Sequence, residues 1–311
     1  MYVWLQISLK MKKILIIFSL IYSIHNLMIA SNPDSTKIEI KKKKKIEGPR
    51  GFEFSGNFGG YFANKYNAQY YNGNSVNENN IDFVLKNQYW FDEIKNILRT
   101  SINRDSIMLS ELPTNMKYSP SMYVGFGVRY NYTPSWALNI QFNFTKLIAK
   151  DFFTFQVFPA FDNENRSYVK YGIIGSETRN NIEIGVLHTF MPEKIIRPFA
   201  EVGVLFTNTK VKESKILIES SEYSLINIYS GSYIPNTQLQ ENNILQGGLS
   251  FGGYVNGGVK FVFNDFASFE VMASMYYKQI NLQPYKDFKI HGAGMVRLIL
   301  SPAFFIKKEE M

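Results

Sequence analysis

Residues 121–131 read SMYVGFGVRYN and residues 136–145 read WALNIQFNFT, with a gap of only four residues between the two stretches. In both, apolar or aromatic side chains occupy every second position, and mostly polar or small side chains occupy the positions between. A period of two places these two kinds of side chain on opposite faces of a β-strand. The pair therefore predicts two neighbouring strands, each with one apolar face, joined by a short turn.

Six further segments of the chain show the same alternation. Their apolar faces begin at Phe52, Ile182, Ala200, Leu249, Phe269 and Ile290. Each of the eight segments can supply the roughly 9–11 residues that a tilted membrane strand requires. The links at 132–135, 191–196 and 264–267 are short, and those at 64–119, 149–179, 212–245 and 281–289 are longer. Short turns on one side and long loops on the other are typical of outer-membrane barrels.

The prediction is therefore an all-β fold, an eight-stranded antiparallel transmembrane β-barrel with up-and-down meander order over residues 50–306. An apolar outer face in lipid requires closure, because an open sheet edge would leave backbone groups unpaired. The alternative is a soluble β-sandwich or lipocalin-like barrel with the apolar face turned inward. The membrane barrel is favoured because the polar face is rich in Gly, Ser and Asn, and because aromatic residues gather beside the short turns. The predicted periplasmic aromatic girdle consists of Tyr130, Tyr132, Trp136, Phe190, Phe263, Phe269 and Phe304.

Two long links contain strand patterns of their own. Residues 152–158 and 168–174 predict that one hairpin of the barrel continues above the membrane. Residues 215–229 predict another hairpin, and its insertion into the wall would raise the strand count to ten.

The composition also fits a barrel better than a helical membrane protein. Aromatic residues make up 16% of the chain and charged residues 19%, and the mean hydropathy is -0.15. Only one apolar run approaches the about 20 residues of a membrane helix, and it lies at the N-terminus. The chain contains no Cys, which excludes disulfides and thiolate metal sites.

The net charge of +8 is concentrated near the N-terminus. Lys10, Lys12, Lys13 and the run Lys41–Lys45 account for all of it, and the rest of the chain is balanced. This distribution gives little support to a nucleic-acid-binding face.

The first 30 residues predict a cleaved signal peptide. Met11-Lys12-Lys13 begins a charged segment, residues 14–24 are apolar, and Ala30 is a small residue placed for cleavage. A retained membrane anchor is the alternative, and the start is either Met1 or Met11. Residues 31–49 predict a flexible basic lead-in within the periplasm, and residues 307–311 a C-terminal tail.

Charged residues also fall on the inward face of the predicted strands. They are Glu53, Arg129, Glu183, Glu201, Lys260, Glu270, Lys278 and Arg297. Four acids and four bases in a narrow lumen are expected to pair, because an unpaired buried charge is costly. The expected result is a closed, salt-bridged polar core. A gated ion path is the functional alternative, since an eight-stranded lumen is too narrow for a permanently open pore.

The link at 64–119 is the longest and breaks the period of two. Its apolar residues recur at helical spacing near 80–100, with Asn79 or Asn80 placed to cap the start. The predicted apolar face of this helix is Ile81, Val84, Trp90, Phe91, Ile94 and Leu98. The helix is expected either to pack on the barrel rim and other loops, or to serve as a lid, plug or partner-binding element.

Little in the sequence points to catalysis. Of the three His residues, His25 lies in the signal peptide, His188 lies beside a short turn, and His291 lies near the outer rim. A hydrolase based on His291 would need a Ser and an orienting acid beside it. Metal-ligand spacings, phosphate-binding loops and dinucleotide fingerprints are missing. We therefore expect no enzyme activity, no cofactor and no metal.

The whole segment 50–306 resembles the outer-membrane β-barrel families typified by the OmpA transmembrane domain. It is most similar to the PorT-like barrel-domain proteins of Bacteroidota, notably in the phrase Arg197-Pro198-Phe199-Ala200-Glu201-Val202-Gly203 after a short turn. A departure is that Phe304 and Phe305 are followed by six further residues, although such barrels commonly end on an aromatic residue.

The resemblance implies an integral outer-membrane protein that contacts lipid or lipopolysaccharide and is inserted by the barrel assembly machinery. We expect a non-enzymatic role, structural or through a protein partner at the extracellular loops, such as a surface ligand or an envelope or secretion machine. A small channel and an outer-membrane hydrolase are the alternatives.

Overall fold

The computed structural model describes residues 50–102, 104–159, 167–227, 246–264 and 266–301. The predicted signal peptide at 1–30, the basic lead-in at 31–49, Phe304 and the tail at 307–311 lie outside the described residues. In the part of the chain that is described, no helix is long and apolar enough to cross a membrane.

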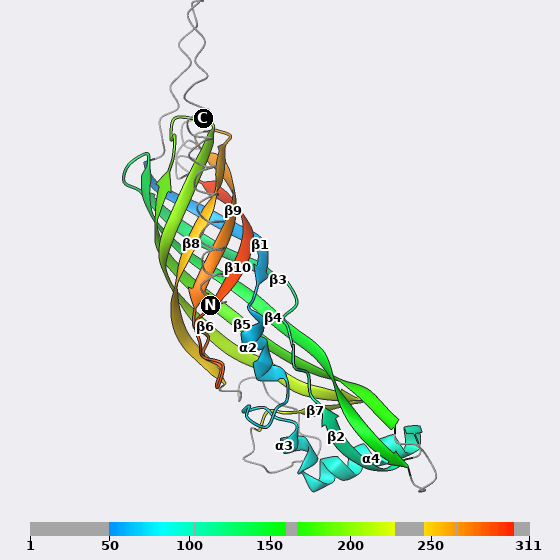
Figure 1. Cartoon of the computed structure of the whole chain (residues 1–311). Helices are drawn as coiled ribbons and strands as arrows, with labels where there is room; N and C mark the ends of the chain where they lie inside the picture. The colour runs from blue at the N-terminus through cyan, green and yellow to red at the C-terminus, as the bar shows by residue number, and fades with distance from the viewer. Residues whose placement is uncertain (1–49, 103, 160–166, 228–245, 265, 302–311) are drawn as a thin grey trace, which may run out of the picture. The chain divides into compact units, whose positions relative to one another are not determined.

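Eight antiparallel strands of the described chain close into a ring (Figure 1). They are β1 (Gly51–Phe62), β3 (Ser121–Asn131), β4 (Trp136–Pro159), β5 (Ser167–Thr189), β6 (Ile196–Ile218), β8 (Gly247–Val262), β9 (Ala267–Lys278) and β10 (Lys289–Leu300). Each strand pairs with the next in this order, and β10 pairs with β1 to complete the ring. The wall therefore follows an up-and-down meander and has no open edge.

The alternation of side chains turns the apolar face outward. Phe58 of β1 lies opposite Val124 of β3 and Val296 of β10, and its side chain is 56% exposed. The adjacent Asn57 points into the ring and is 5% exposed. This is the opposite of the arrangement that a soluble barrel requires.

Exposed apolar side chains form a continuous band around the outside of the ring, which we call the apolar belt. The belt comprises the outward positions of residues 52–62, 122–130, 136–144, 182–186, 196–206, 249–255, 271–277 and 290–298. On the side of the short turns, five members of the predicted aromatic girdle are exposed and Phe269 is half-buried. The described ring thus combines an apolar exterior with a polar interior.

Three strands continue far past the belt. β4, β5 and β6 have 24, 23 and 23 residues, whereas the other ring strands have between 11 and 16. Beyond the ring, β2 (Arg104–Glu111) pairs with β4, and β7 (Ser221–Ser224) pairs with β6. The result is a five-stranded extension, β2-β4-β5-β6-β7, which we call the outer sheet (Figure 1). The hairpin over residues 215–229 thus lies in the outer sheet as far as it is described, and it adds no strand to the ring.

The link between β1 and β3 contains α2 (Lys65–Ala68), the 3-10 helix η1 (Gln69–Tyr71), α3 (Asp82–Leu85) and α4 (Gln88–Ile102). The single helix expected near 80–100 is therefore two helices. The break has a local cause, because the Asn87 side chain accepts hydrogen bonds from the backbone N–H groups of Tyr89 and Trp90 and so starts a new helix.

Most of the predicted apolar helix face is buried. Ile81, Val84, Ile94 and Leu98 are buried in one cluster with residues of the outer sheet, while Trp90 and Phe91 are half-buried. The strand β2 was not predicted, because it follows directly on α4 and its alternation covers only a few residues. Its role is to widen the outer sheet on which the helices pack.

Candidate functional site

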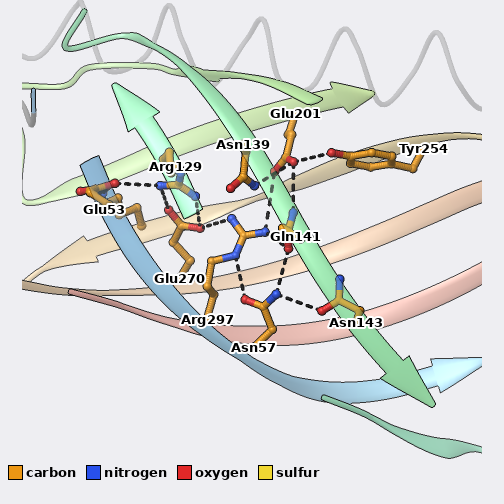
Figure 2. A network of polar contacts seen from close by, with 11 residues as sticks. Glu53, Asn57, Arg129, Asn139, Gln141, Asn143, Glu201, Tyr254, Glu270 and Arg297 are labelled. Carbon is orange, nitrogen blue, oxygen red and sulfur yellow. Dashed lines mark hydrogen bonds and ion pairs between the residues drawn. The ribbon is translucent and has the colours of Figure 1, made fainter. Parts of the chain in front are cut away.

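Glu270 lies at the centre of a buried charge network inside the ring (Figure 2). One of its carboxylate oxygens accepts from Arg129 Nη1 at 2.7 Å, and the other accepts from Arg297 Nη1 at 2.8 Å. Glu53 accepts from Lys260 Nζ at 2.9 Å and lies 3.4 Å from Arg129 Nη1. These side chains are at most 4% exposed, so bulk water does not surround their charges.

Strand register explains why these charges meet. Glu270 of β9 lies directly opposite Arg297 of β10 and Lys260 of β8, and Glu53 of β1 lies opposite Arg129 of β3. Cross-strand partners on the same face are close enough to form ion pairs. The long Arg129 side chain then reaches across the lumen from β3 to Glu270 on β9, which joins the two groups into one network.

Neutral polar side chains extend this network toward β4 and β6 (Figure 2). Glu201 accepts from Tyr254 Oη at 2.7 Å and from Asn139 Nδ2 at 2.9 Å. Arg297 Nη2 donates to Gln141 Oε1 at 2.8 Å and lies 3.7 Å from the Glu201 carboxylate. Buried charges are tolerated when such hydrogen bonds satisfy them, and the network therefore serves as a polar core.

In the half of the lumen nearer the outer sheet, two charged side chains, Lys278 and Glu183, do not pair with an opposite charge as expected. Lys278 donates to Asn181 Oδ1 and to Thr207 Oγ1, each at 3.1 Å. Glu183 instead accepts from Tyr123 Oη at 2.7 Å. Among the described residues neither forms an ion pair, so the expectation that all eight lumen charges pair with opposite charges is wrong for these two.

The reason is a hydrogen-bonded chain of neutral side chains between the two charges. Asn181 Nδ2 donates to Tyr123 Oη at 2.6 Å, so Lys278 reaches Glu183 only through Asn181 and Tyr123. Tyr123 occupies an inward position of the decisive alternating stretch, although tyrosine also suits an outward position. Its position in the alternation was the only sequence signal for this arrangement.

Beyond the apolar belt, on the side of the outer sheet, a second buried cluster connects the β1–β3 link to the wall of the ring. Glu177 accepts from Tyr71 Oη at 2.7 Å, from Tyr118 Oη at 3.0 Å and from Arg179 Nε at 2.5 Å. Burial and the Glu177 carboxylate raise the pKa of both phenols, so both hydroxyls remain protonated donors. Tyr71 and Tyr118 were not predicted as site residues, because they lie in an irregular link.

A glycine makes room for the hydrogen bond between Tyr71 and Glu177. Gly175 of β5 lies beneath the Tyr71 ring, and a Cβ built on it would lie 2.1 Å from Tyr71 Cγ. No side chain fits at that distance from Cγ, the ring atom that is bonded to Cβ and cannot move without the whole ring. Gly175 therefore permits Tyr71 to reach the Glu177 carboxylate.

The loops also enclose a surface cavity of about 540 Å³. It lies between residues 70–78 of the β1–β3 link, the start of β8 and the β9–β10 link at 281–286. Its polar lining includes Tyr70, Glu78, Gln246, Asn281 and Lys286. Its size falls within the range of small-molecule sites in proteins.

His291 is not arranged as the base of a hydrolase. It is 1% exposed, and its Nδ1 accepts the backbone N–H of Asn64 at 3.1 Å. In a catalytic triad this nitrogen donates to an acidic side chain. In the part of the chain that is described, no cluster of three or more His, Asp or Glu residues can hold a metal ion.

Comparisons with known proteins found neither a matching protein family nor a matching curated protein. Among solved structures, Neisserial surface protein A (NspA) is similar with a TM-score of 0.37 and 6% identity, over 80% of this chain and 95% of that one. The outer membrane protein OprG from Pseudomonas aeruginosa has a TM-score of 0.33 and 12% identity, over 82% and 95% of the two chains. Ail, the attachment invasion locus protein of Yersinia pestis, in complex with the heparin analogue sucrose octasulfate, has a TM-score of 0.33 and 9% identity, over 81% and 99%.

Proposed function

We propose that the chain is an integral, non-enzymatic β-barrel of a bacterial outer membrane that presents a partner-binding outer sheet at the cell surface. The apolar belt carries this proposal. Side chains such as Phe58 and Phe126, 56% and 62% exposed, surround a closed ring with a polar interior. In water such a surface would cost about 25 cal/mol for each Å² of apolar area, and a lipid environment removes that cost.

The proposed orientation follows from the connections. β1 begins and β10 ends on the side of the short turns, and we place this side in the periplasm. The outer sheet and α4 then lie outside the cell. The predicted signal peptide, insertion by the barrel assembly machinery and membership of the PorT-like barrels of Bacteroidota are parts of the same proposal.

The partner-binding role is proposed for the helices and links that pack on the outer sheet. Tyr89 at the start of α4 is 72% exposed, and Val76 beside the cavity is 69% exposed. Large apolar side chains exposed on a rigid support are typical of surfaces that bind other molecules.

A photoreactive amino acid at position 89 tests this role in intact outer membranes. We expect crosslinks to a protein partner from position 89, because Tyr89 lies on the proposed binding surface. The matched control is position 122, since Met122 is 64% exposed but belongs to the apolar belt and should crosslink to lipid. Lipid adducts at both positions, with no protein adduct at 89, would contradict the partner-binding role.

The barrel is expected not to conduct ions. The network around Glu270 joins residues of β1, β3, β4, β6, β8, β9 and β10 across the lumen, and an eight-stranded barrel has an interior just wide enough for side chains. Planar-bilayer recordings of the folded protein should therefore show no steps above the baseline. Reproducible unitary currents would favour the small-channel alternative.

A further inference from the structure

The outer edge of the apolar belt on β4, β5 and β6 consists of successive rows of paired residues. From the belt outward, the rows are Phe142–Ile182–Phe206, Phe144–Asn180–Asn208 and Lys146–Thr178–Lys210. All of these side chains lie on the outward face that carries the belt. The surface thus changes from apolar to basic within two rows.

The basic row lies at the height of lipid headgroups. Two residues of a strand tilted by about 40° rise by roughly 5 Å along the barrel axis. Lys146 is therefore about 5 Å beyond Phe144, and Lys210 is about 10 Å beyond Phe206. The headgroup region adds roughly 5–8 Å to each side of the hydrocarbon core, and the flexible lysine stems span the remaining distance.

The two lysines of this row have no ion-pair partner among the described residues. Lys146 is exposed and Lys210 is half-exposed. By contrast, Lys215 on the same face lies 2.8 Å from Glu222 and 3.4 Å from Glu213. Among the described residues, Glu213 and Glu222 are thus engaged by Lys215, while Lys146 and Lys210 remain available to another anion.

The spacing of the lysines suits a phosphate. Lys146 and Lys210 lie on either side of Thr178, two strand spacings or about 10 Å apart at the backbone. Two flexible ammonium groups at this separation can converge on one phosphate, and the Thr178 hydroxyl can donate a third hydrogen bond. A second exposed lysine on β4, Lys150, lies two rows farther out.

From this arrangement we infer that Lys146, Thr178 and Lys210 bind the phosphate of an anionic outer-leaflet lipid. The inference rests on the proposed membrane insertion, because it assumes that the belt contacts the acyl chains. Continuity with the belt favours a lipid as the ligand, because the acyl chains of a lipid with its phosphate at this row would contact Phe144 and Ile182. Each lysine near an anionic membrane surface strengthens binding by about five-fold.

The test uses the full-length folded protein in phosphatidylcholine vesicles that contain 10% bis-phosphorylated lipid A. Native mass spectrometry after extraction counts the lipid A molecules that remain on each barrel. The double variant Lys146→Gln/Lys210→Gln is expected to weaken lipid A retention by about 25-fold. The matched control Lys86→Gln/Lys95→Gln removes the same charge from the residue after α3 and from α4, and it should retain lipid A like the unmodified protein.

Three outcomes would overturn the inference. Retention could be equal in the Lys146→Gln/Lys210→Gln variant and the unmodified protein. Retention could fall equally in both double variants, which would indicate general charge attraction. Inorganic phosphate at 10 mM could displace the bound lipid A, which would indicate a site for a soluble anion. Heat-modifiable gel mobility of each sample separates these results from failure of the proposed function, because a protein that does not insert shows no folded band.

Discussion

Replacement of Glu270 by alanine is expected to lower the free energy of unfolding by about 3–5 kcal/mol. The carboxylate accepts from both Arg129 and Arg297, and the change leaves two guanidinium groups buried with fewer partners. The transition can be measured by urea titration in detergent micelles, followed by heat-modifiable mobility and by tryptophan fluorescence, to which Trp136 in the apolar belt and Trp90 in α4 contribute. Coincidence of the two signals would support a two-state analysis.

The matched control for this prediction is Glu222→Ala. Glu222 also pairs with a base, Lys215 at 2.8 Å, but its side chain is 60% exposed. An exposed pair contributes only about 0–1 kcal/mol, so the control should differ little from the unmodified protein. Equal losses in the two variants would show that burial of the Glu270 network does not determine its contribution. A Glu270→Ala/Arg129→Ala double variant should recover part of the loss, because it removes one of the unpaired charges.

Replacement of Gly175 by alanine is expected to release the β1–β3 link from the wall while the ring stays folded. The new Cβ would lie 2.1 Å from Tyr71 Cγ, so the Tyr71 ring must move away from Glu177. Loss of the charge-assisted hydrogen bond and local overpacking together cost about 3 kcal/mol. Protease cleavage within residues 64–119 should therefore accelerate by roughly 100-fold, since cleavage follows the population of the open form.

Gly294→Ala is the control for this prediction. Gly294 lies in β10, and a Cβ built there meets no atom within 4 Å. Its variant should resist protease like the unmodified protein and keep the same heat-modifiable band. Unchanged cleavage in Gly175→Ala would show that the Tyr71–Glu177 contact does not hold the link in place.

The alternating strands were predictable because each one carries its own signal. Residues such as Phe52, Phe54 and Phe58 show the outward face of β1 without reference to any other strand. The eight inward charges follow from the same alternation, and all of them are buried. Their exact partners depend on register and on side-chain reach, which explains why Arg129 bridges to Glu270 while Lys278 binds amide and hydroxyl groups.

The link between β1 and β3 was predictable only in part. The helical spacing of Ile81, Val84, Ile94 and Leu98 marks residues that become buried together. The division into α3 and α4 depends on one capping side chain, Asn87, and the strand β2 depends on its pairing with β4. The hydrogen bond from Tyr71 to Glu177 joins residues more than 100 positions apart, and a local pattern carries no information about such a contact.

The length of β4 and β5 has a mechanical consequence. Their pairing runs without interruption from Trp136 opposite His188 in the wall to Val157 opposite Ser167 in the outer sheet. A pulling force applied to a molecule held at the outer sheet acts along these strands. The backbone hydrogen bonds that cross between the strands are then loaded in shear and share the load, instead of being peeled apart one after another. The same strands that form the wall of the ring therefore also resist tension between the ring and the outer sheet.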